Sequence, residues 1–334
     1  MFSLGMMGGY VMKRESDAIF TYAPRLLSAD TLVEEFAQQM LPTTSSQGQR
    51  EVHICHENPY KDSLLPNHSF ATAELRAQLW MANKTNIRNA LYFDSHDKNT
   101  HAKFNAFDVM APCHQNCTGD CGSDASKIVC GIQHLQEGCI VYSIGSNNNW
   151  IFEEEIYNMT PCHIHTFDCT GPKQRFQPPA IIRNRHTFHH MCLSSHSEPT
   201  PTKIVPTGRI RSTIMGPMET LEGMQRMLNH TRLDLLKMDV EGYEFPLFES
   251  WPELTDLTAS SKVFLPMQVL VEIHYSTHMK DLRPSQPGVP FKTEIELVAL
   301  QEHLLKMGYV VAVRDDNRLC RHCTELTLLR HKCI

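Results

Sequence analysis

Hydrophobic residues recur in the second half of the chain as short runs separated by longer amphipathic stretches. Seven runs rich in β-branched and aliphatic residues have the length of strands, and they lie at 138–146, 162–168, 186–194, 233–239, 267–275, 309–316 and 325–331. Four stretches with helical spacing lie between them, at 150–159, 218–230, 243–251 and 291–308. Strands that alternate with helices predict an α/β fold with a doubly wound, mostly parallel sheet. The last two runs have no helix between them, which predicts a closing antiparallel hairpin.

The first part of the chain, residues 1–74, lacks this alternation. Its segments, such as 56–69, are polar and rich in turn-forming residues. Apolar residues at helical spacing predict one helix at 28–41 and another at 70–84. We therefore expect a loosely organised N-terminal extension over 1–74 and a single domain over 75–334.

Charge and hydropathy narrow the range of partners. The formal net charge is -6, and there is no long basic run, so nucleic acid is not an expected partner. No stretch of 18 consecutive apolar residues is present, so no integral membrane segment is expected. The oligomeric state does not follow from these properties.

Cysteines and glycosylation motifs bear on the compartment. Twelve cysteines are many for a cytosolic enzyme. Five Asn-x-Ser/Thr triplets, which are acceptor motifs for N-glycosylation, occur at Asn67, Asn83, Asn116, Asn158 and Asn229. Together they favour a glycoprotein of the secretory lumen. The start of the sequence is a poor signal peptide, because no positive segment precedes its apolar stretch. Two locations stay open: a secretory or Golgi lumen, if a targeting segment is missing here, and otherwise the cytoplasm.

The cysteine spacing does not indicate a metal site. Residues 113–130 carry cysteines in a C-x3-C-x3-C-x8-C pattern, which lacks the paired C-x2-C knuckles of structural zinc sites. Disulfides or free thiols are the better interpretation. The single C-x2-C pair, Cys320 and Cys323, is interpreted in the same way. No metal is predicted.

Candidate ligand-binding residues gather where the predicted strands end. In doubly wound sheets, ligands bind outside the carboxyl ends of the strands. The first strand ends in "SIGSNNNW", the second in Asp168, the fourth in Asp239 and Glu241, and the fifth carries Glu272 and His274. One glycine turn and several carboxylates are therefore expected to converge on one edge of the sheet.

The residues at this edge favour S-adenosylmethionine over a dinucleotide. A dinucleotide needs the Gly-x-Gly-x-x-Gly loop, and only Gly145 is present, which disfavours a nucleotide-dependent oxidoreductase. S-adenosylmethionine has no phosphate and carries a sulfonium cation, an amino acid end and a ribose diol, which suit a tight turn and nearby acids. The predicted cofactor-binding residues are Ser143, Gly145, Ser146, Asn147, Asp168, at the ribose, and Asp239.

Four segments in this order resemble the FkbM-like branch of class I methyltransferases: "CIVYSIGSNNNWIFEEEI", "CHIHTFDCT", "TLEGMQRMLNHTRLDLLKMDVEGYE" and "VLVEIHY". The resemblance covers about 75–334. It implies a Rossmann-like seven-stranded sheet, S-adenosylmethionine as cofactor and methyl transfer, mostly to oxygen. The loop "SNNNW" departs from the family because it lacks a second glycine, although asparagine tolerates left-handed backbone.

Three residues are predicted to be catalytic. Asp239 is expected to face the methionine end of the cofactor or the reacting centre, and Glu241 to orient the acceptor or the loop. The alternative for both is stabilisation of the N-terminus of the following helix, which is the preferred interpretation for Glu244. His274 is expected to be the general base, and the alternative is a core histidine bonded to a carboxylate. Positioning alone can supply much of the acceleration of a methyl transfer.

The sequence thus predicts an S-adenosylmethionine-dependent methyltransferase that acts on oxygen of a small molecule, glycan or protein acceptor. The alternative is a non-catalytic glycoprotein of the secretory pathway that keeps a degenerate methyltransferase fold. Binding of the cofactor separates the two.

Overall fold

The structure is a computed structural model, and it describes residues 52–94, 102–123, 125–200, 216–257, 263–275, 292–316 and 323–333. All of these residues belong to one compact unit, Leu41–Ile334. The helix expected at 28–41 lies outside the described residues. Within the described ranges, no helix combines the length and the apolar character needed to cross a bilayer.

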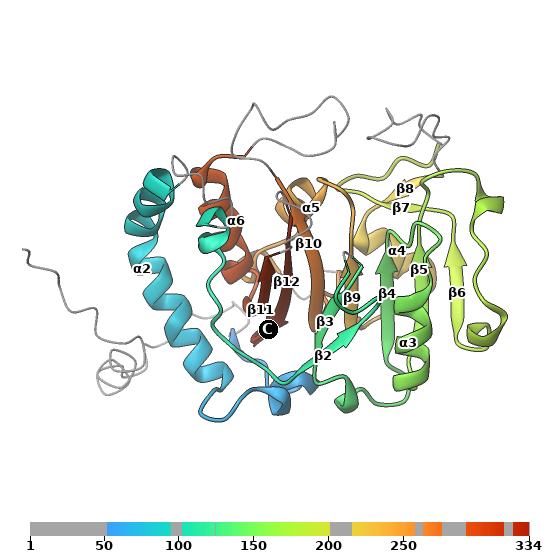
Figure 1. The fold of residues 1–334 in the computed structure, drawn as a ribbon, viewed down its shortest axis with the longest axis horizontal. Coiled ribbons are helices and arrows are strands. Elements are labelled where there is room, and N and C mark those ends of the chain that lie inside the picture. Colours follow the sequence, from blue (N-terminus) through green and yellow to red (C-terminus); the bar gives the residue numbers. More distant parts are fainter. Residues whose placement is uncertain are drawn as a thin grey trace, which may run out of the picture. The chain divides into compact units, whose positions relative to one another are not determined.

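A seven-stranded sheet occupies the centre of the unit (Figure 1). Its spatial order is β11-β12-β10-β9-β4-β5-β6. The strands are β4 (Ile140–Ile144), β5 (His163–Phe167), β6 (His186–His189), β9 (Leu235–Met238), β10 (Gln268–His274), β11 (Tyr309–Asp316) and β12 (Cys323–Arg330). Strand β12 runs in the opposite direction to the other six strands of this sheet. The predicted doubly wound sheet with a closing antiparallel hairpin is confirmed, and β12 inserts between β10 and β11.

The register of the central strands brings their ends to one level. Ile144 at the end of β4 pairs with Phe167 of β5 on one side and with Met238 of β9 on the other. The residues that follow these strands therefore lie side by side at one edge of the sheet. Strand β10 continues past this level, because Val271 pairs with Met238 and three more residues follow it in the strand.

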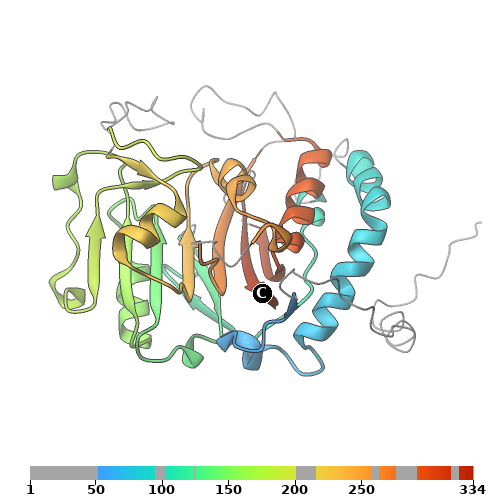
Figure 2. The same ribbon diagram turned by 180° about the vertical axis from the view of Figure 1, so that it is seen from behind.

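Helices cover both faces of the sheet. Helix α3 (Ile151–Met159) lies over the face seen in Figure 1, and α4 (Leu221–Leu228) and α5 (Glu244–Ser250) lie over the face seen in Figure 2. Helix α6 (Glu294–Lys306) packs against α5 and β11, and α2 (Phe70–Asp94) packs against α6. The five helices expected at 70–84 and beyond are present, although α2 is ten residues longer at its C-terminal end and α4 is preceded by a short strand.

The buried side chains form two layers, one on each face of the sheet. All four residues of β9 are buried, and their side chains alternate between the layers. Leu236 and Met238 belong to the layer that also holds residues of α4, α5 and α6, whereas Leu235 belongs to the layer that holds residues of α3. Because β9 is buried on both faces, its residues are apolar except for one lysine, Lys237.

Short elements complete the described fold. Strand β1 pairs with β13 near the C-terminus, β2 with β3, and β7 with β8. These strands are β1 (His53–Ile54), β2 (Gln115–Thr118), β3 (Lys127–Cys130), β7 (Cys192–Leu193), β8 (Met218–Glu219) and β13 (Lys332–Cys333). The 3-10 helices are η1 (Pro59–Ser63), η2 (Ala102–Ala106), η3 (Ile132–His134), η4 (Lys173–Arg175), η5 (Ala180–Ile182) and η6 (Leu254–Asp256).

The cysteines in the described part of the chain are all in disulfides. Five disulfides join Cys55–Cys333, Cys113–Cys130, Cys117–Cys121, Cys139–Cys162 and Cys169–Cys192. Cys323 is disulfide-bonded as well. No described cysteine is a free thiol. The spacing over 113–130 therefore reflects disulfides, and such a set of bonds is typical of an oxidising compartment.

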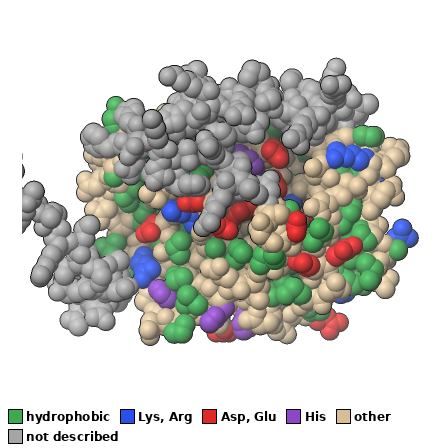
Figure 3. Space-filling view, in the orientation of Figure 1, with side chains coloured by type: hydrophobic (Ala, Val, Ile, Leu, Met, Phe, Trp, Pro, Cys, Tyr) green, Lys and Arg blue, Asp and Glu red, His purple; other side chains and the backbone are tan. Residues whose placement is uncertain are grey.

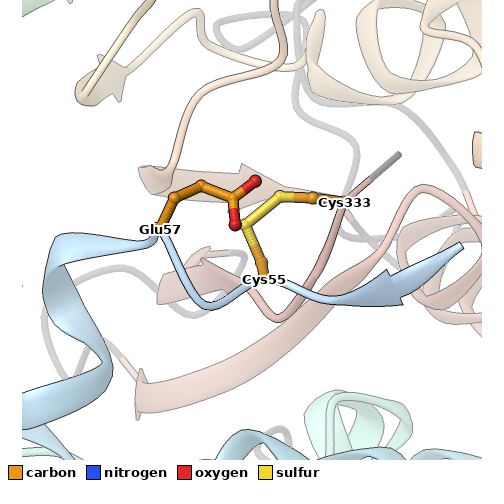
Figure 4. A group of neighbouring side chains, drawn as sticks. All are labelled: Cys55, Glu57 and Cys333. Carbon is orange, nitrogen blue, oxygen red and sulfur yellow. A yellow bond between two sulfur atoms is a disulfide. The ribbon is translucent and has the colours of Figure 1, made fainter.

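The Cys55–Cys333 bond ties residues 53–55 to the other end of the chain (Figure 4). The backbone of β1 pairs with β13 at the same place. The part of the expected extension that the structure describes, 52–74, is thus anchored to the sheet domain rather than loosely attached.

Candidate active site

Gly145 begins the loop after β4 and touches the end of β9. Its backbone has a φ of 79°, a left-handed conformation. A Cβ at this position would overlap the carbonyl oxygen of Asp239. Only glycine satisfies both conditions, so the first predicted strand end and the fourth are in direct contact here.

Two asparagines replace the second glycine of the usual methyltransferase loop. Asn147 and Asn148 have φ values of 48° and 62°, so both adopt the left-handed conformation. The side-chain oxygen of Asn148 accepts hydrogen bonds from Trp150 Nε1 at 3.1 Å and from the Gln177 amide at 2.9 Å. The turn is therefore formed without the glycine, and its second half is held by side-chain contacts.

Asp168 connects this loop to the one after β5. Its carboxylate is almost fully buried, with 2% of the residue exposed. Oδ2 accepts a hydrogen bond from the Asn147 amide at 2.7 Å, and Oδ1 accepts from the amide and hydroxyl of Thr170 at 2.8 and 2.5 Å. The Ser146 hydroxyl lies 3.5 Å from Oδ2. The predicted residues Ser146, Asn147 and Asp168 are thus brought together, and two hydroxyl groups are among the donors to the carboxylate.

Ser143 lies within β4, before the loop begins. The residue is fully buried beside Glu153 of α3, whose pKa is raised by burial. Thr166 donates a hydrogen bond to Glu153 at 3.2 Å. Nearby, Lys237 Nζ donates to the carbonyl oxygen of Gly145 at 2.7 Å. Lys237 therefore supports the turn, whereas Ser143 lies beside α3.

A buried lysine lies among the carboxyl groups of Asp239, Glu272 and Glu325. Lys127 of β3 is 1% exposed, and its Nζ lies 2.5 Å from Glu325 Oε1, 3.7 Å from Glu272 Oε2 and 3.8 Å from Asp239 Oδ2. Glu272 and Glu325 are direct cross-strand partners in the β10–β12 ladder. Like charges at such positions repel one another, and this repulsion favours the protonated form of one carboxyl group beside the Lys127 ammonium. Lys127 lies beneath the surface in the view of Figure 3, which shows other acidic and basic side chains on this face of the molecule.

The pKa values of the residues in this cluster are shifted in different directions. Burial lowers the pKa of Lys127, but the surrounding carboxylates more than offset this and raise it above its usual value. Burial alone would raise the pKa of Asp239, but the charges of Lys127 and Lys237 hold it below its usual value. Burial, followed by repulsion from Asp239 and Glu325, raises the pKa of Glu272 to about 9. At neutral pH, Asp239 is therefore ionised while Glu272 keeps its proton.

His274 at the end of β10 is bound to a buried carboxylate. Its Nδ1 donates to Glu244 Oε1 at 2.9 Å, and Glu244 is fully buried. Its Nε2 lies 3.8 Å from Glu241 Oε2 and 3.9 Å from Glu272 Oε2. Burial lowers the pKa of His274, but the hydrogen bond and charge of Glu244 outweigh it and raise the pKa to about 10. The imidazole therefore carries its proton at neutral pH, and a role as general base requires that a ligand lower its pKa.

Asp239 and Glu241 lie on the turn that precedes α5. The helix begins after Tyr243, which makes no side-chain capping bond, and its first residue is Glu244. Glu244 Oε1 also accepts a hydrogen bond from the amide of Gly242 at 3.1 Å. Glu241 has a φ of 53°, and 72% of its side chain is exposed on the turn. The roles of Asp239 and Glu241, catalysis or stabilisation of the helix N-terminus by their charge, stay predictions, whereas Glu244 stabilises both the turn and His274.

Three groups among the described residues have potential metal-ligand atoms within 4.8 Å of one another. They are Cys55 with Glu57 and Cys333, Glu272 with His274 and Cys323, and Asp239 with Glu241 and His274. The sulfur atoms of the first group are bonded to each other, as Figure 4 shows, and Cys323 is also in a disulfide. In the third group, Lys127 and protonated His274 already lie beside the carboxylates. The absence of a metal stays a prediction.

Lys127 and Glu325 were not identified as site residues from the sequence. A signal was present, because each is a charged residue within an otherwise apolar strand, in "SKIVC" and "CTELTLL". Charged residues at such positions are rarely buried without partners. Which residues they meet depends on a contact between β3 and the sheet, 198 positions apart for this pair, and no local pattern indicates it.

Comparison with known proteins gives a family. A family model described as "Methyltransferase domain" matches residues 76–330. No curated protein matches the chain.

Solved structures with some likeness are distant from this chain. One is the fibrillarin pre-rRNA processing protein of Methanococcus jannaschii, with 7% identity, a TM-score of 0.36, and coverage of 61% of this chain and 70% of that one. Another is a Clostridium thermocellum protein named as an rRNA-methylase, with 8% identity, a TM-score of 0.34, and coverage of 59% and 88%. The [4+2]-cyclase SpnF has 9% identity and a TM-score of 0.31, over 59% and 76% of the two chains. Values this low support no functional conclusion.

Proposed function

Because this chain belongs to the methyltransferase-domain family, we propose that it transfers a methyl group from S-adenosylmethionine to an oxygen atom of an acceptor, as a member of the FkbM-like branch. The observation that carries the proposal is the contact set of Asp168. This one buried carboxylate receives the backbone amide of the glycine-containing loop and the hydroxyls of Thr170 and, at the limit of hydrogen-bonding distance, Ser146.

The residues present fit the cofactor. A ribose diol donates two hydroxyl groups, and Asp168 already accepts from hydroxyls that a diol can replace. The turn at Gly145 and Asn147 has the left-handed backbone that a close approach requires. Asp239, held ionised by Lys127, offers a negative charge to a cationic group. S-adenosylmethionine, when bound, supplies an electrophilic methyl group.

The chain's own residues then orient the acceptor and control its proton. Asp239 is ionised and 24% exposed, so it can accept a hydrogen bond from an acceptor hydroxyl. Lys127 and Glu244 fix the positions of Asp239 and His274. Glu241 on the turn lies 3.8 Å from His274 Nε2 and has 72% of its side chain exposed, so it can also contact the acceptor. These roles use positioning and electrostatics, which supply much of the acceleration of an in-line displacement.

His274 becomes a base only in the filled site. Its pKa of about 10 results from the carboxylates around it, of which Glu244 contributes most. A bound cation opposes these charges and lowers the pKa of a nearby imidazole. Cofactor binding therefore brings His274 closer to the range in which it accepts a proton from a hydroxyl, and the pH dependence of the rate reports this pKa.

The acceptor is proposed to be a small molecule, a glycan or a protein. The disulfides favour a secretory or Golgi lumen, where glycan and protein acceptors are available. A non-catalytic lumenal glycoprotein with the same fold is the second candidate, because it shares the disulfides and does not need the asparagine-containing loop to bind a cofactor.

Calorimetric titration with S-adenosylmethionine and S-adenosylhomocysteine tests the proposal. We expect micromolar binding of both, and a loss of at least tenfold in affinity for Asp168→Asn, because the amide replaces one acceptor oxygen by a donor. The matched control is Asp234→Asn. Asp234 is equally buried and accepts a backbone amide, that of Ile140, but it lies at the opposite end of the sheet.

The outcomes separate the two candidate functions. Binding that Asp168→Asn weakens and Asp234→Asn preserves supports the methyltransferase. If folded wild-type protein binds neither compound, the enzyme proposal is wrong and the non-catalytic glycoprotein is favoured. Equal effects of the two variants would show that Asp168 acts only on the stability of the fold.

A further inference from the structure

Four of the five Asn-x-Ser/Thr triplets place their asparagine on the surface. Asn67, Asn83, Asn158 and Asn229 are all exposed, and each comes from a different part of the fold. Asn67 precedes α2, Asn83 lies within α2, Asn158 lies in the last turn of α3, and Asn229 ends α4. A bulky polar substituent on any of these side chains extends into solvent.

The fifth triplet is different. Asn116 lies in β2, where it pairs with the fully buried Val129 of β3, and it is only partly exposed. Two residues on, Thr118 is fully buried and donates to the Lys127 carbonyl oxygen at 3.0 Å. Residues two apart in a strand share a face. The Asn116 side chain is therefore on the inward face of the hairpin and is less accessible to the glycosylation machinery than the four exposed asparagines.

Two of the exposed sites lie far from the candidate active site. Helix α3 follows β4 at the loop edge of the sheet and so ends at the opposite edge, next to Asn158. Helix α4 ends just before β9 begins, so Asn229 also lies at that opposite edge. Helix α2 is the outer layer beyond α6 in Figures 1 and 2, and it carries Asn83 away from the sheet.

N-glycosylation also requires that the chain enter an oxidising compartment, and the disulfides bear on this requirement. N-glycosylation takes place in the same oxidising compartment in which disulfides form. Five bonds are described, and they span from 4 positions, Cys117–Cys121, to 278 positions, Cys55–Cys333. A chain with this pairing folds where the glycosylation machinery is present.

We propose that Asn67, Asn83, Asn158 and Asn229 carry N-linked oligosaccharides, and that Asn116 does not. In the modification, the side-chain Nδ2 forms a bond to the anomeric carbon of an oligosaccharide held on a lipid diphosphate. The bond between that carbon and the diphosphate oxygen breaks, the lipid diphosphate leaves with the bonding electrons, and the amide loses one proton. This assignment is independent of methyl transfer.

Site mapping on the full chain tests the proposal. The 334-residue chain is expressed in animal cells behind a cleavable secretion signal, purified, and treated with peptide N-glycosidase in ¹⁸O-labelled water. The enzyme converts each glycosylated asparagine to labelled aspartate. Peptide mass spectrometry then gives the occupancy of each triplet. We expect occupancy above half at the four exposed asparagines and below half at Asn116.

Matched variants identify each site without changing the asparagine. Thr85→Ala removes the triplet at Asn83, whereas Thr85→Ser keeps it, and Thr85 is exposed, so neither change disturbs packing. The alanine variant should lose one glycan and the serine variant should not. Secreted, disulfide-bonded protein without labelled aspartate at the four positions would overturn the proposal, and so would occupancy above half at Asn116.

Discussion

At the scale of single residues, the conformation of the loop after β4 depends on a glycine, which has no side chain. Gly145 combines a left-handed backbone with direct contact to the Asp239 carbonyl oxygen. Asn147 and Asn148 show that the backbone conformation alone does not require glycine, because they adopt it with side chains. It is the contact with β9 that makes Gly145 irreplaceable.

The first prediction compares two glycines. Gly138 has a φ of 81°, close to that of Gly145 at 79°, but a Cβ there would meet nothing within 4 Å. Gly138→Ala should cost only the left-handed strain, about 1–2 kcal/mol of unfolding free energy. Gly145→Ala should cost more and should abolish cofactor binding, since β9 must move. Urea unfolding and calorimetry measure both, and equal losses in the two variants would contradict the role given to the contact.

Lys127 is the residue on which the buried carboxylates depend. Lys127→Met leaves the buried carboxylates of Glu325 and Asp239 without their cation, and we expect it to lower the unfolding free energy by about 3–5 kcal/mol. Adding Glu325→Gln should recover part of the loss, because one of the stranded charges is then removed. The exposed Lys61, changed to Met, is the control and should have an effect within about 0.5 kcal/mol. Strictly additive losses in the double variant would argue against a shared network.

At the scale of elements, disulfides join segments that hydrogen bonds alone connect weakly. Strands β1 and β13 are two residues each, too short to hold together independently. The Cys55–Cys333 bond fixes them and so attaches the described start of the chain to its end. The residues from 52 to 74 thereby join the sheet domain.

Two disulfides of very different span allow a controlled test. Replacing Cys55 and Cys333 by serine opens a loop of 278 residues, and replacing Cys117 and Cys121 opens one of 4. If the bonds act by restricting the unfolded chain, the losses should be about 5 and about 2 kcal/mol, respectively. Denaturant unfolding gives both values. A larger loss for the shorter loop would indicate that strain or local packing dominates instead.

At the scale of the whole molecule, the charged cluster around Lys127 in the candidate active site is assembled from five elements. Lys127 comes from β3, Asp239 follows β9, Glu272 and His274 belong to β10, and Glu325 belongs to β12. Helix α5 contributes Glu244. Their mutual charges make the stability of the fold depend on pH.

The alkaline range should reveal this dependence. The pKa values of Glu272 and His274 are raised to about 9 and about 10 in the folded protein, so the folded state binds more protons than the unfolded state between pH 6.5 and 9. Stability is therefore lost as the pH rises through this window. Glu272→Gln removes one of the two groups, and the melting temperature of this variant should fall less between pH 7 and 9. A wild-type melting temperature that rises over this range would contradict the folded-state pKa values.

The spacing of apolar residues along the chain was sufficient to predict the order of strands and helices. Every strand run from 138 to 331 and every helical stretch from 150 to 308 contains the corresponding element, because buried parallel strands are uninterrupted apolar runs and surface helices are not. Knowing that parallel strands end at one edge was sufficient to bring the loop at Gly145 together with Asp168 and Asp239. The catalytic roles of Asp239, Glu241 and His274 stay predictions.

The sequence could not indicate the protonation states of those side chains or the partners that hold them. Asp168 is held by Thr170 and Asn147, His274 is protonated beside Glu244, and Lys127 balances Asp239. Each of these facts depends on burial and on partners that lie far away in the chain or across a turn. The sequence by itself determined the α/β fold and the edge at which its polar residues meet, since both follow from local periodicity. Only the tertiary structure decided which charges are paired and protonated, because electrostatic energies depend on distance in space and on exclusion of water.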